Sequence, residues 1–196
     1  MTVYCATTNP GKLREFNLIA AHYAAGQLEV IPVPGLKSIE PPEEIGLTFA
    51  ENAIIKAEYY SAFIDGPLFA DDSGLVVDAL NGAPGIYSAR YAGEGATDSA
   101  NNARVLEALR ESSNRTARFV CAIAVAIGDH SFETFEDYVE GQLLTEARGP
   151  NGFGYDPLFF YPPFNCTFGE ASAETKLLVS HRGKAMYKMM QWMLKP

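Results

Sequence analysis

The 196-residue sequence contains few cysteines and no long apolar run. Its three cysteines, Cys5, Cys121 and Cys166, are widely spaced and odd in number, which argues against a disulfide framework or a zinc site. No apolar run approaches the ~20 residues that a helix needs to cross a bilayer, and no basic segment followed by an apolar one marks a signal peptide. We therefore expect reduced thiols, no contact with a membrane and a cytoplasmic location.

Basic residues are also scarce. The chain has 15 Lys and Arg against 24 Asp and Glu, a formal net charge of -9, which is unfavourable for non-specific binding to a nucleic-acid backbone. This balance still permits a small phosphorylated ligand, which needs only a local cluster of cations, or a metal ion. Because 47% of the residues are hydrophobic, a globular core is expected, in one domain or in two lobes that share a core.

The elements alternate in type along the chain. Helices are predicted over residues 10–23 behind an Asn9 cap, after a capping box at Thr48, from Thr97 to about Arg110, and after Ser180, where a methionine stripe indicates core packing. Strands are predicted over residues 2–7, 28–33, 118–128, 132–139 and 141–146, with two short strands around a Ser73-Gly74 turn and a turn at 128–130. The first half favours a parallel core and the second half antiparallel additions.

The sequence Phe69-Ala70-Asp71-Asp72-Ser73-Gly74 is the most informative stretch. An apolar run delivers two carboxylates and a hydroxyl to a glycine. Adjacent carboxylates at the end of a buried strand need partners, because desolvated charges are unfavourable. A metal ion, a catalytic role or a basic side chain would satisfy them. A surface Asp-Ser-Gly turn is the alternative.

Two further loops could contribute to a site for phosphate or metal. Thr7-Thr8-Asn9-Pro10-Gly11-Lys12 leaves a strand and opens a helix, where backbone N–H groups and a lysine favour phosphate, although Asn-Pro-Gly is also an ordinary helix entry. Glu43-Glu44 precedes the second helix and Lys56 lies on its early turns; each of these residues, taken alone, also fits a solvated surface.

Two other loops could contact a flat, acceptor-rich ligand. Glycines on each side of Phe153, in the run Phe153-Gly154-Tyr155-Asp156, leave its ring face open for stacking, with a packed hairpin aromatic as the alternative. His181 and Arg182 fall in the first turn of the last helix, with Lys176 upstream. Positive charge is unfavourable there, which indicates an anionic or acceptor-rich partner; a capped surface turn is the other interpretation.

Six stretches, in this order, resemble the inosine triphosphate pyrophosphatase family in its bacterial form. They are Thr7-Thr8-Asn9-Pro10-Gly11-Lys12, Thr48-Phe49-Ala50-Glu51-Asn52-Ala53, Phe69-Ala70-Asp71-Asp72-Ser73-Gly74-Leu75, residues 82–91, Phe153-Gly154-Tyr155-Asp156-Pro157 and Ser180-His181-Arg182. The resemblance runs from about Val3 to Met193. It implies one domain over residues 1–196, with an elongated α/β fold: two lobes around a long central mixed β-sheet and a deep substrate cleft.

The resemblance also implies a reaction. Non-standard purine nucleoside triphosphates (ITP, dITP and XTP) would be hydrolysed to the monophosphate and pyrophosphate by a homodimeric, Mg²⁺-dependent enzyme that cleanses the nucleotide pool. Two alternatives are a pyrophosphatase acting on methylated or pyrimidine nucleotides and a non-catalytic nucleotide sensor. The sensor is disfavoured by the presence of Asp72, Lys12 and Lys56 together.

Roles transfer by position in the motifs. Asp72 matches the general base and also a metal ligand. Glu44 matches a second metal ligand, and the adjacent Glu43 is the alternative for this position. Asp71 is expected either to be structural or to support the site without contacting the substrate. The residues matched to triphosphate binding are Thr7, Thr8, Asn9, Pro10, Gly11, Lys12 and Lys56. Ser73 matches a substrate contact beside the general base, Asp72. The residues matched to purine binding are Phe153, Gly154, Tyr155, Asp156, Lys176, His181 and Arg182.

Overall fold

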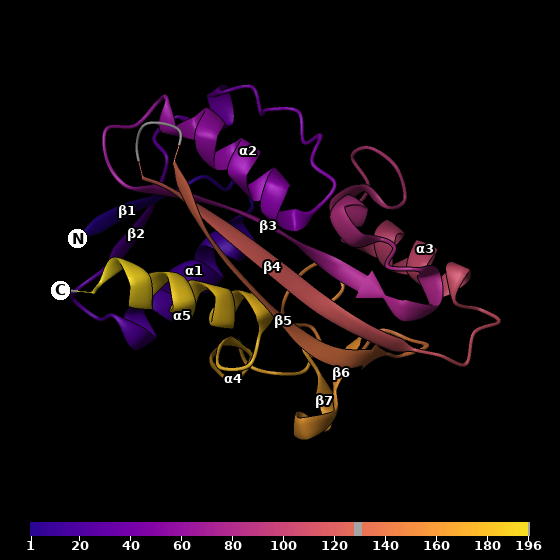
Figure 1. Ribbon diagram of the computed structural model, residues 1–196. Helices are drawn as coiled ribbons and strands as arrows, with labels where there is room; N and C mark the ends of the chain where they lie inside the picture. The colour runs from indigo at the N-terminus through magenta and orange to yellow at the C-terminus, as the bar shows by residue number, and fades with distance from the viewer. Residues whose placement is uncertain (128–130, 196) are drawn as a thin grey trace. The chain divides into compact units, whose positions relative to one another are not determined.

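The structure, a computed structural model, describes residues 1–127 and 131–195 (Figure 1). The helices are α1 (Pro10–Tyr23), α2 (Phe49–Ser61), α3 (Asp98–Ala108), α4 (Ala173–Leu177) and α5 (His181–Met193). The strands are β1 (Thr2–Cys5), β2 (Glu29–Pro32), β3 (Leu68–Val77), β4 (Thr116–Ala126), β5 (Phe132–Leu143), β6 (Phe159–Tyr161) and β7 (Cys166–Thr167).

The seven strands form one mixed sheet in the order β2-β1-β3-β4-β5-β6-β7. Strand β1 pairs parallel with β2 and with β3, whereas β6 pairs antiparallel with β5 and with β7. The predicted α/β fold, with a parallel beginning and antiparallel additions, is confirmed. The chain divides into two compact units: unit 1 holds Met1–Asp72, most of the stretch from Cys121 to Asp137, and α5, and unit 2 holds Ser73–Val120 and Tyr138–Ser180.

The helix starts follow from the capping residues that the sequence predicts. The Asn9 side chain accepts from the backbone of Gly11 and Lys12 at the start of α1. Thr48 and Glu51 form a complete capping box on α2, and the Thr97 hydroxyl accepts from the backbone N–H of Ala100 on α3. Each cap satisfies amides that the first helical turn leaves without a partner, so these three boundaries could be predicted locally.

Two strand predictions are wrong. Strand β3 runs without a break through Ser73 and Gly74, where the sequence predicts a turn. Gly74 is buried in extended backbone, and a Cβ there would collide with Ser88 Oγ and lie 2.5 Å from the carbonyl oxygen of Gly85. The glycine therefore serves the close approach of another segment. The separate strand expected over 141–146 is the end of β5, which reaches Leu143. The turn predicted at 128–130 lies outside the described residues.

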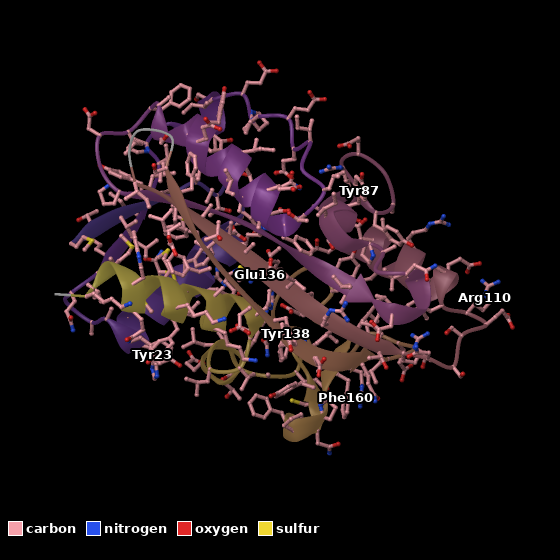
Figure 2. All side chains as sticks on the ribbon, viewed as in Figure 1. Tyr23, Tyr87, Arg110, Glu136, Tyr138 and Phe160 are labelled. Carbon is pink, nitrogen blue, oxygen red and sulfur yellow. The ribbon has the colours of Figure 1, made fainter. Side chains whose placement is uncertain are left out.

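In unit 1, α1 and α5 lie side by side and α2 lies on the other side of β1–β3 (Figure 1). The methionine stripe of α5 is core packing as predicted, since Met186, Met189 and Met190 are buried. Tyr23 lies at the end of α1 (Figure 2). It packs against Tyr187 of α5 with ring centroids 4.8 Å apart, and its side chain remains partly exposed.

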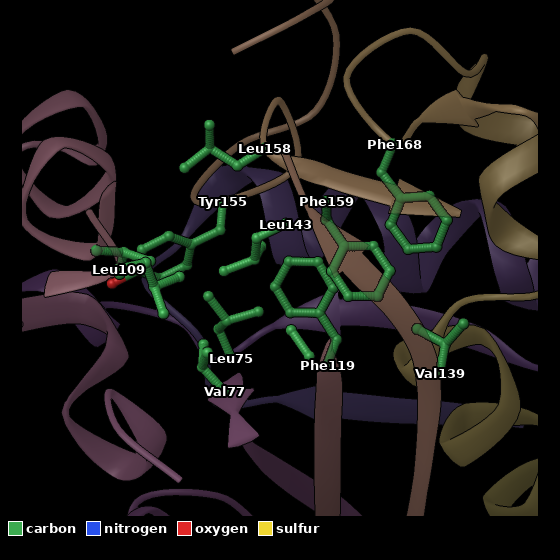
Figure 3. Close-up of a cluster of buried hydrophobic side chains, with 12 residues drawn as sticks. Leu75, Val77, Leu109, Phe119, Val139, Leu143, Tyr155, Leu158, Phe159 and Phe168 are labelled. Atoms are coloured by element: carbon green, nitrogen blue, oxygen red, sulfur yellow. The ribbon is translucent and has the colours of Figure 1, made fainter. Parts of the chain in front are cut away.

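Unit 2 has its own aromatic core (Figure 3). Phe119, Phe159 and Phe168 pack with centroid separations of 4.5 to 6.2 Å, and Leu75 and Tyr155 belong to the same buried cluster. The cluster joins the second half of β3 to β4, β5 and the loop before β6. Strands β6 and β7 were not predicted, because they are only three and two residues long.

The thiols of Cys5 and Cys121 are buried, and all three cysteines are free, as the sequence indicates. Burial raises the pKa of both buried thiols, and the nearby Asp71 carboxylate raises each further. They are consequently protonated and unreactive. No helix within 1–127 or 131–195 combines the length and apolarity needed to span a membrane.

The close packing at Gly74 makes a stability prediction. Gly74→Ala should lower the free energy of unfolding by about 3 kcal/mol, because the added methyl group has no space beside the Gly85 carbonyl. Gly35→Ala is the control: Gly35 has a φ of +69° but nothing lies within 4 Å of the added Cβ, so only about 1 kcal/mol should be lost. Urea unfolding measures both, and equal losses would contradict the steric explanation.

Candidate functional site

The two carboxylates of β3 point in opposite directions. Successive side chains of a strand alternate between the faces of the sheet. Asp71 meets Lys12 of α1, whereas Asp72 meets Lys56 of α2. The adjacent pair is therefore split, and each buried carboxylate has a cation from a different helix.

Asp71 is fully buried and its Oδ2 lies 2.8 Å from Lys12 Nζ. Burial by itself would raise the pKa of Asp71, but the charges of Lys12 and then Arg182 outweigh it and hold the pKa below its usual value. Asp71 is thus ionised and paired with Lys12, which fits either of the two roles expected for it.

Asp72 belongs to a cluster with Lys56 and Glu44. Lys56 Nζ lies 3.0 Å from Asp72 Oδ1 and 3.0 Å from Glu44 Oε1, so one ammonium group bridges two carboxylates. Burial, followed by the neighbouring Glu44, raises the pKa of Asp72 despite Lys56 and Lys12. Burial would lower the pKa of Lys56, yet Asp72, Asp71 and Glu44 raise it. A carboxylate with a raised pKa is better suited to accept a proton than an ordinary surface aspartate.

The same two carboxylates suit a hard divalent cation. Mg²⁺ prefers oxygen ligands and is usually held by one or two carboxylates together with substrate phosphates and water. Within the described residues no three His, Cys, Asp or Glu side chains are gathered as a metal site. Glu44 is half-buried and bonded to Lys56, while Glu43 is exposed, which favours the Glu44 register.

The Thr7–Lys12 loop contains the predicted Asn9 cap, and this cap limits which groups the loop can offer to phosphate. Asn9 Oδ1 already accepts from Gly11 N at 2.8 Å and Lys12 N at 3.1 Å, and Pro10 has no N–H. The backbone amides that the sequence suggests for phosphate are therefore occupied by the cap. Thr8, Asn9 and Pro10 are exposed, and the Thr7 hydroxyl accepts from Asn9 N. What this loop can offer an anion is the Thr hydroxyls, the helix dipole and Lys12.

Unit 2 holds a buried charged pair between Asp156 and Lys176. Lys176 Nζ lies 2.6 Å from Asp156 Oδ2, and both side chains are at most 5% exposed. The ammonium group also lies 5.2 Å from the ring centroid of Phe153 and 5.5 Å from that of Phe168. A buried lysine is thus fixed by one carboxylate and two aromatic rings.

The Phe153 loop is built around Asp156. Asp156 Oδ2 also accepts from Phe153 N at 2.9 Å, and a Cβ at Gly152 would overlap the Asp156 carboxylate. Phe153 and Gly154 are half-buried. The side chain of Tyr155 turns into the core of unit 2 and its hydroxyl donates to the Ser88 carbonyl at 2.7 Å, so within this structure it serves packing. Burial raises the pKa of Tyr155 and keeps the hydroxyl protonated.

At the start of α5, Arg182 is buried in unit 1, where its guanidinium forms an ion pair with Glu15 of α1 and lies 5.8 Å from the Phe16 ring centroid. Burial opposes the charge, but Glu15 raises the pKa of Arg182. The anionic partner that the sequence indicates for this turn is therefore, at least in part, an internal carboxylate. His181 is buried beside it, and Ser73 is half-buried at the beginning of unit 2.

Two residues that contact the predicted site residues were not predicted from the sequence: Asn52, which contacts Asp72, and Glu15, which pairs with Arg182. Glu15 has no local signal, because its partner is 167 residues away. Asn52 does have a local signal. Asparagine is unfavourable within a helix, so an asparagine directly after a capping box and on the apolar face of α2 indicates a specific hydrogen-bond partner.

Among proteins of known structure, the chain is similar in fold to Ham1 proteins. The Ham1 protein of Staphylococcus aureus superposes with a TM-score of 0.85 at 39% identity, covering 98% of each chain. The HAM1 protein of Coxiella burnetii gives a TM-score of 0.86 at 38% identity with the same coverage. These similarities define the class of fold.

Sequence comparison identifies the family. Residues 3–192 match the model of the Ham1 family. The dITP/XTP pyrophosphatase of Listeria innocua is 45% identical over 189 residues, covering 95% of this chain and 92% of the relative. The protein of the same name from Acidobacterium capsulatum is 44% identical over 195 residues, 95% of each chain. The chain belongs to the Ham1 family, and the resemblance found in its six motifs is confirmed.

The Lys12–Asp71 pair makes a pH-dependent prediction. The lowered pKa of Asp71 contributes stability above about pH 4, its unfolded value, and that stability is lost as the pH falls through the folded pKa. Lys12→Met removes the salt bridge, so the pKa of Asp71 should rise, with Arg182 as the main remaining cation. The unfolding free energy should drop by about 2–3 kcal/mol at pH 7.5 and by less at pH 4.5.

Lys188→Met is the matched control for this experiment. Lys188 pairs with Asp137 at 2.9 Å, but its side chain is 52% exposed. Its loss should lower the unfolding free energy by less than about 1 kcal/mol at either pH. If urea unfolding gives Lys12→Met the same small effect at pH 7.5, the buried pair does not stabilise Asp71 as described.

Proposed function

We propose that this protein hydrolyses the non-standard purine nucleoside triphosphates ITP, dITP and XTP to the monophosphate and pyrophosphate, and so cleanses the nucleotide pool. The observation that carries the proposal is the Glu44–Lys56–Asp72 cluster in a chain of the Ham1 family, whose curated relatives are named dITP/XTP pyrophosphatase. The cluster combines a base, a cation for phosphate and two metal-binding carboxylates.

Asp72 is proposed as the general base. It would take the proton of a water whose oxygen attacks the α-phosphorus, while the bond from that phosphorus to the bridging oxygen breaks and pyrophosphate leaves. A divalent cation, proposed as Mg²⁺ and held by Glu44 and Asp72, would neutralise phosphate charge and lower the pKa of bound water. The Lys56 ammonium group, which pairs with Glu44 and Asp72 here, would replace part of these contacts by contacts with phosphate oxygens.

The remaining phosphate ligands are proposed in the first loop. Lys12 supplies a charge, and the Thr7 and Thr8 hydroxyls supply donors. Because Asn9 holds the amides of Gly11 and Lys12, the loop Thr7-Thr8-Asn9-Pro10-Gly11-Lys12 would bind through these side chains and the dipole of α1 unless the cap opens.

Recognition of the base is proposed for the residues around Phe153. Its ring would stack on the purine, with Gly154 leaving space and Asp156 fixing Lys176. Hypoxanthine and xanthine carry an acceptor at C6, where adenine carries a donor, and lysine can only donate. Further contacts are assigned, on resemblance, to Ser73, Tyr155, His181 and Arg182. The burial of Tyr155 in the core and the pairing of Arg182 with Glu15 favour supporting roles for those two.

Three further features are proposed: two on resemblance, and the cytoplasmic location on the cysteine pattern and the apolar runs of the sequence. The chain is taken as one domain over residues 1–196, as a homodimer and as a cytoplasmic protein. Sedimentation equilibrium tests the dimer: a single species at the chain mass of 21.3 kDa would refute it.

The reaction is tested by product analysis on a panel of ITP, dITP, XTP, ATP and GTP. We expect pyrophosphate and monophosphate from the first three, and much slower turnover of ATP, because a site built around an acceptor at C6 rejects a donor. EDTA should abolish turnover and Mg²⁺ restore it. Release of orthophosphate and diphosphate would refute the proposed cleavage, and binding without turnover would indicate the nucleotide sensor.

The assignment of the base is tested by Asp72→Asn. The amide cannot accept a proton and is a poor metal ligand, so kcat for ITP should fall by about 10²–10⁴-fold. Asp78→Asn is the control, since Asp78 pairs with Arg118 in an exposed salt bridge of 2.9 Å and should leave kcat within about twofold. A kcat for Asp72→Asn near one third of the unsubstituted value would show that another group is the base.

A further inference from the structure

Asn52 is a fully buried polar side chain on the first turn of α2. Its Oδ1 accepts from Gly46 N at 2.8 Å, and its Nδ2 donates to Asp72 Oδ2 at 3.4 Å. The amide orientation follows from these partners, since a backbone N–H can only donate and an ionised carboxylate can only accept. Asn52 therefore connects the loop that carries Glu44 to the carboxylate of Asp72.

The contact with the loop is tight. A Cβ at Gly46 would lie 2.6 Å from Asn52 Oδ1 and 2.8 Å from Glu51 Cβ, so only glycine allows the backbone to approach α2 this closely. Gly46 lies two residues after Glu44. Fixing its N–H fixes the end of the segment from which the Glu44 carboxylate reaches Lys56.

The contact with Asp72 gives that carboxylate a second donor. Lys56 Nζ binds Oδ1 at 3.0 Å, and Asn52 Nδ2 approaches Oδ2. Because the two oxygens have different donors, rotation about the Cβ–Cγ bond is restricted. Asn52 and Lys56 are four residues apart on α2, so both reach Asp72 from the same side of the helix.

We propose that Asn52 is a positioning residue for the reaction: it sets the orientation of the Asp72 carboxylate and couples it to the Glu44 loop. The inference rests on the proposed function, because it assumes that Asp72 is the reacting base. Asn52 touches neither substrate nor reacting atoms in this assignment and acts through Asp72. Loss of such hydrogen-bonding support behind an active-site ligand lowers activity by about 10–100-fold.

The test compares Asn52→Ser and Asn52→Asp with a matched buried asparagine. Asn101 of α3 is 3% exposed and also bridges a loop, accepting from Ala92 N at 2.8 Å and donating to the Ala89 carbonyl at 3.1 Å, but both its partners are backbone groups. For each variant the melting temperature, the kcat and KM for ITP, and the affinity for ITP by calorimetry in EDTA are measured.

Both Asn52 variants should lower kcat by about 10–100-fold, with ITP affinity in EDTA changed by less than about threefold. Asn101→Ser should lower the melting temperature by a similar amount and leave kcat within about twofold. Asn52→Ser added to Asp72→Asn should produce no further loss of kcat, because Asn52 then has no base to orient.

Three results would overturn the inference: a kcat within threefold of the unsubstituted protein in both Asn52 variants, an equal loss of kcat in Asn101→Ser, or a full additional loss in the double variant. Failure of the proposed function itself looks different. In that case ITP yields no pyrophosphate from the unsubstituted protein, or Asp72→Asn remains active.

Discussion

The burial of two adjacent carboxylates in β3 is the constraint on which the rest of unit 1 depends. Neither Asp71 nor Asp72 could remain charged in the interior without a cation, and strand alternation prevents one lysine from serving both. Two helices are consequently required, one on each side of the strand, and each must place a lysine within ion-pair distance of one aspartate. Asp71 with Lys12 anchors α1, and Asp72 with Lys56 anchors α2.

Much of the fold could be predicted because its signals are local. The caps of α1, α2 and α3 lie within three residues of the amides they satisfy. The role of Gly74 was predicted wrongly because it depends on a tertiary contact. In the sequence, a glycine that forms a turn cannot be distinguished from a glycine that lets Ser88 pack against the strand. Strand β7 and helix α4, of two and five residues, are too short to show any periodicity.

The candidate site divides in the same way. Residue types in motifs indicated Asp72, Lys56 and Lys176, but not which charges pair with which. The partners of Lys176 and Arg182 lie 20 and 167 residues away, so their pairing depends on how distant segments pack. The sequence predicted both an Asn9 cap and phosphate binding by backbone amides of the same loop. The structure shows that the cap takes the amides of Gly11 and Lys12, and a capping side chain and an anion compete for the same donors.

The four-residue separation of Asn52 and Lys56 on α2 has a consequence for how this sequence can change in length. One helical turn brings both side chains to Asp72, so a single insertion or deletion between them would rotate Lys56 by about 100° around the axis while Asn52 stayed in place. Residues beyond Lys56 have no such restriction from this contact. Length variation among descendants of this chain should therefore be absent between positions 52 and 56 and be tolerated in the loop that follows α2, since Ala57 and Tyr60 are also buried.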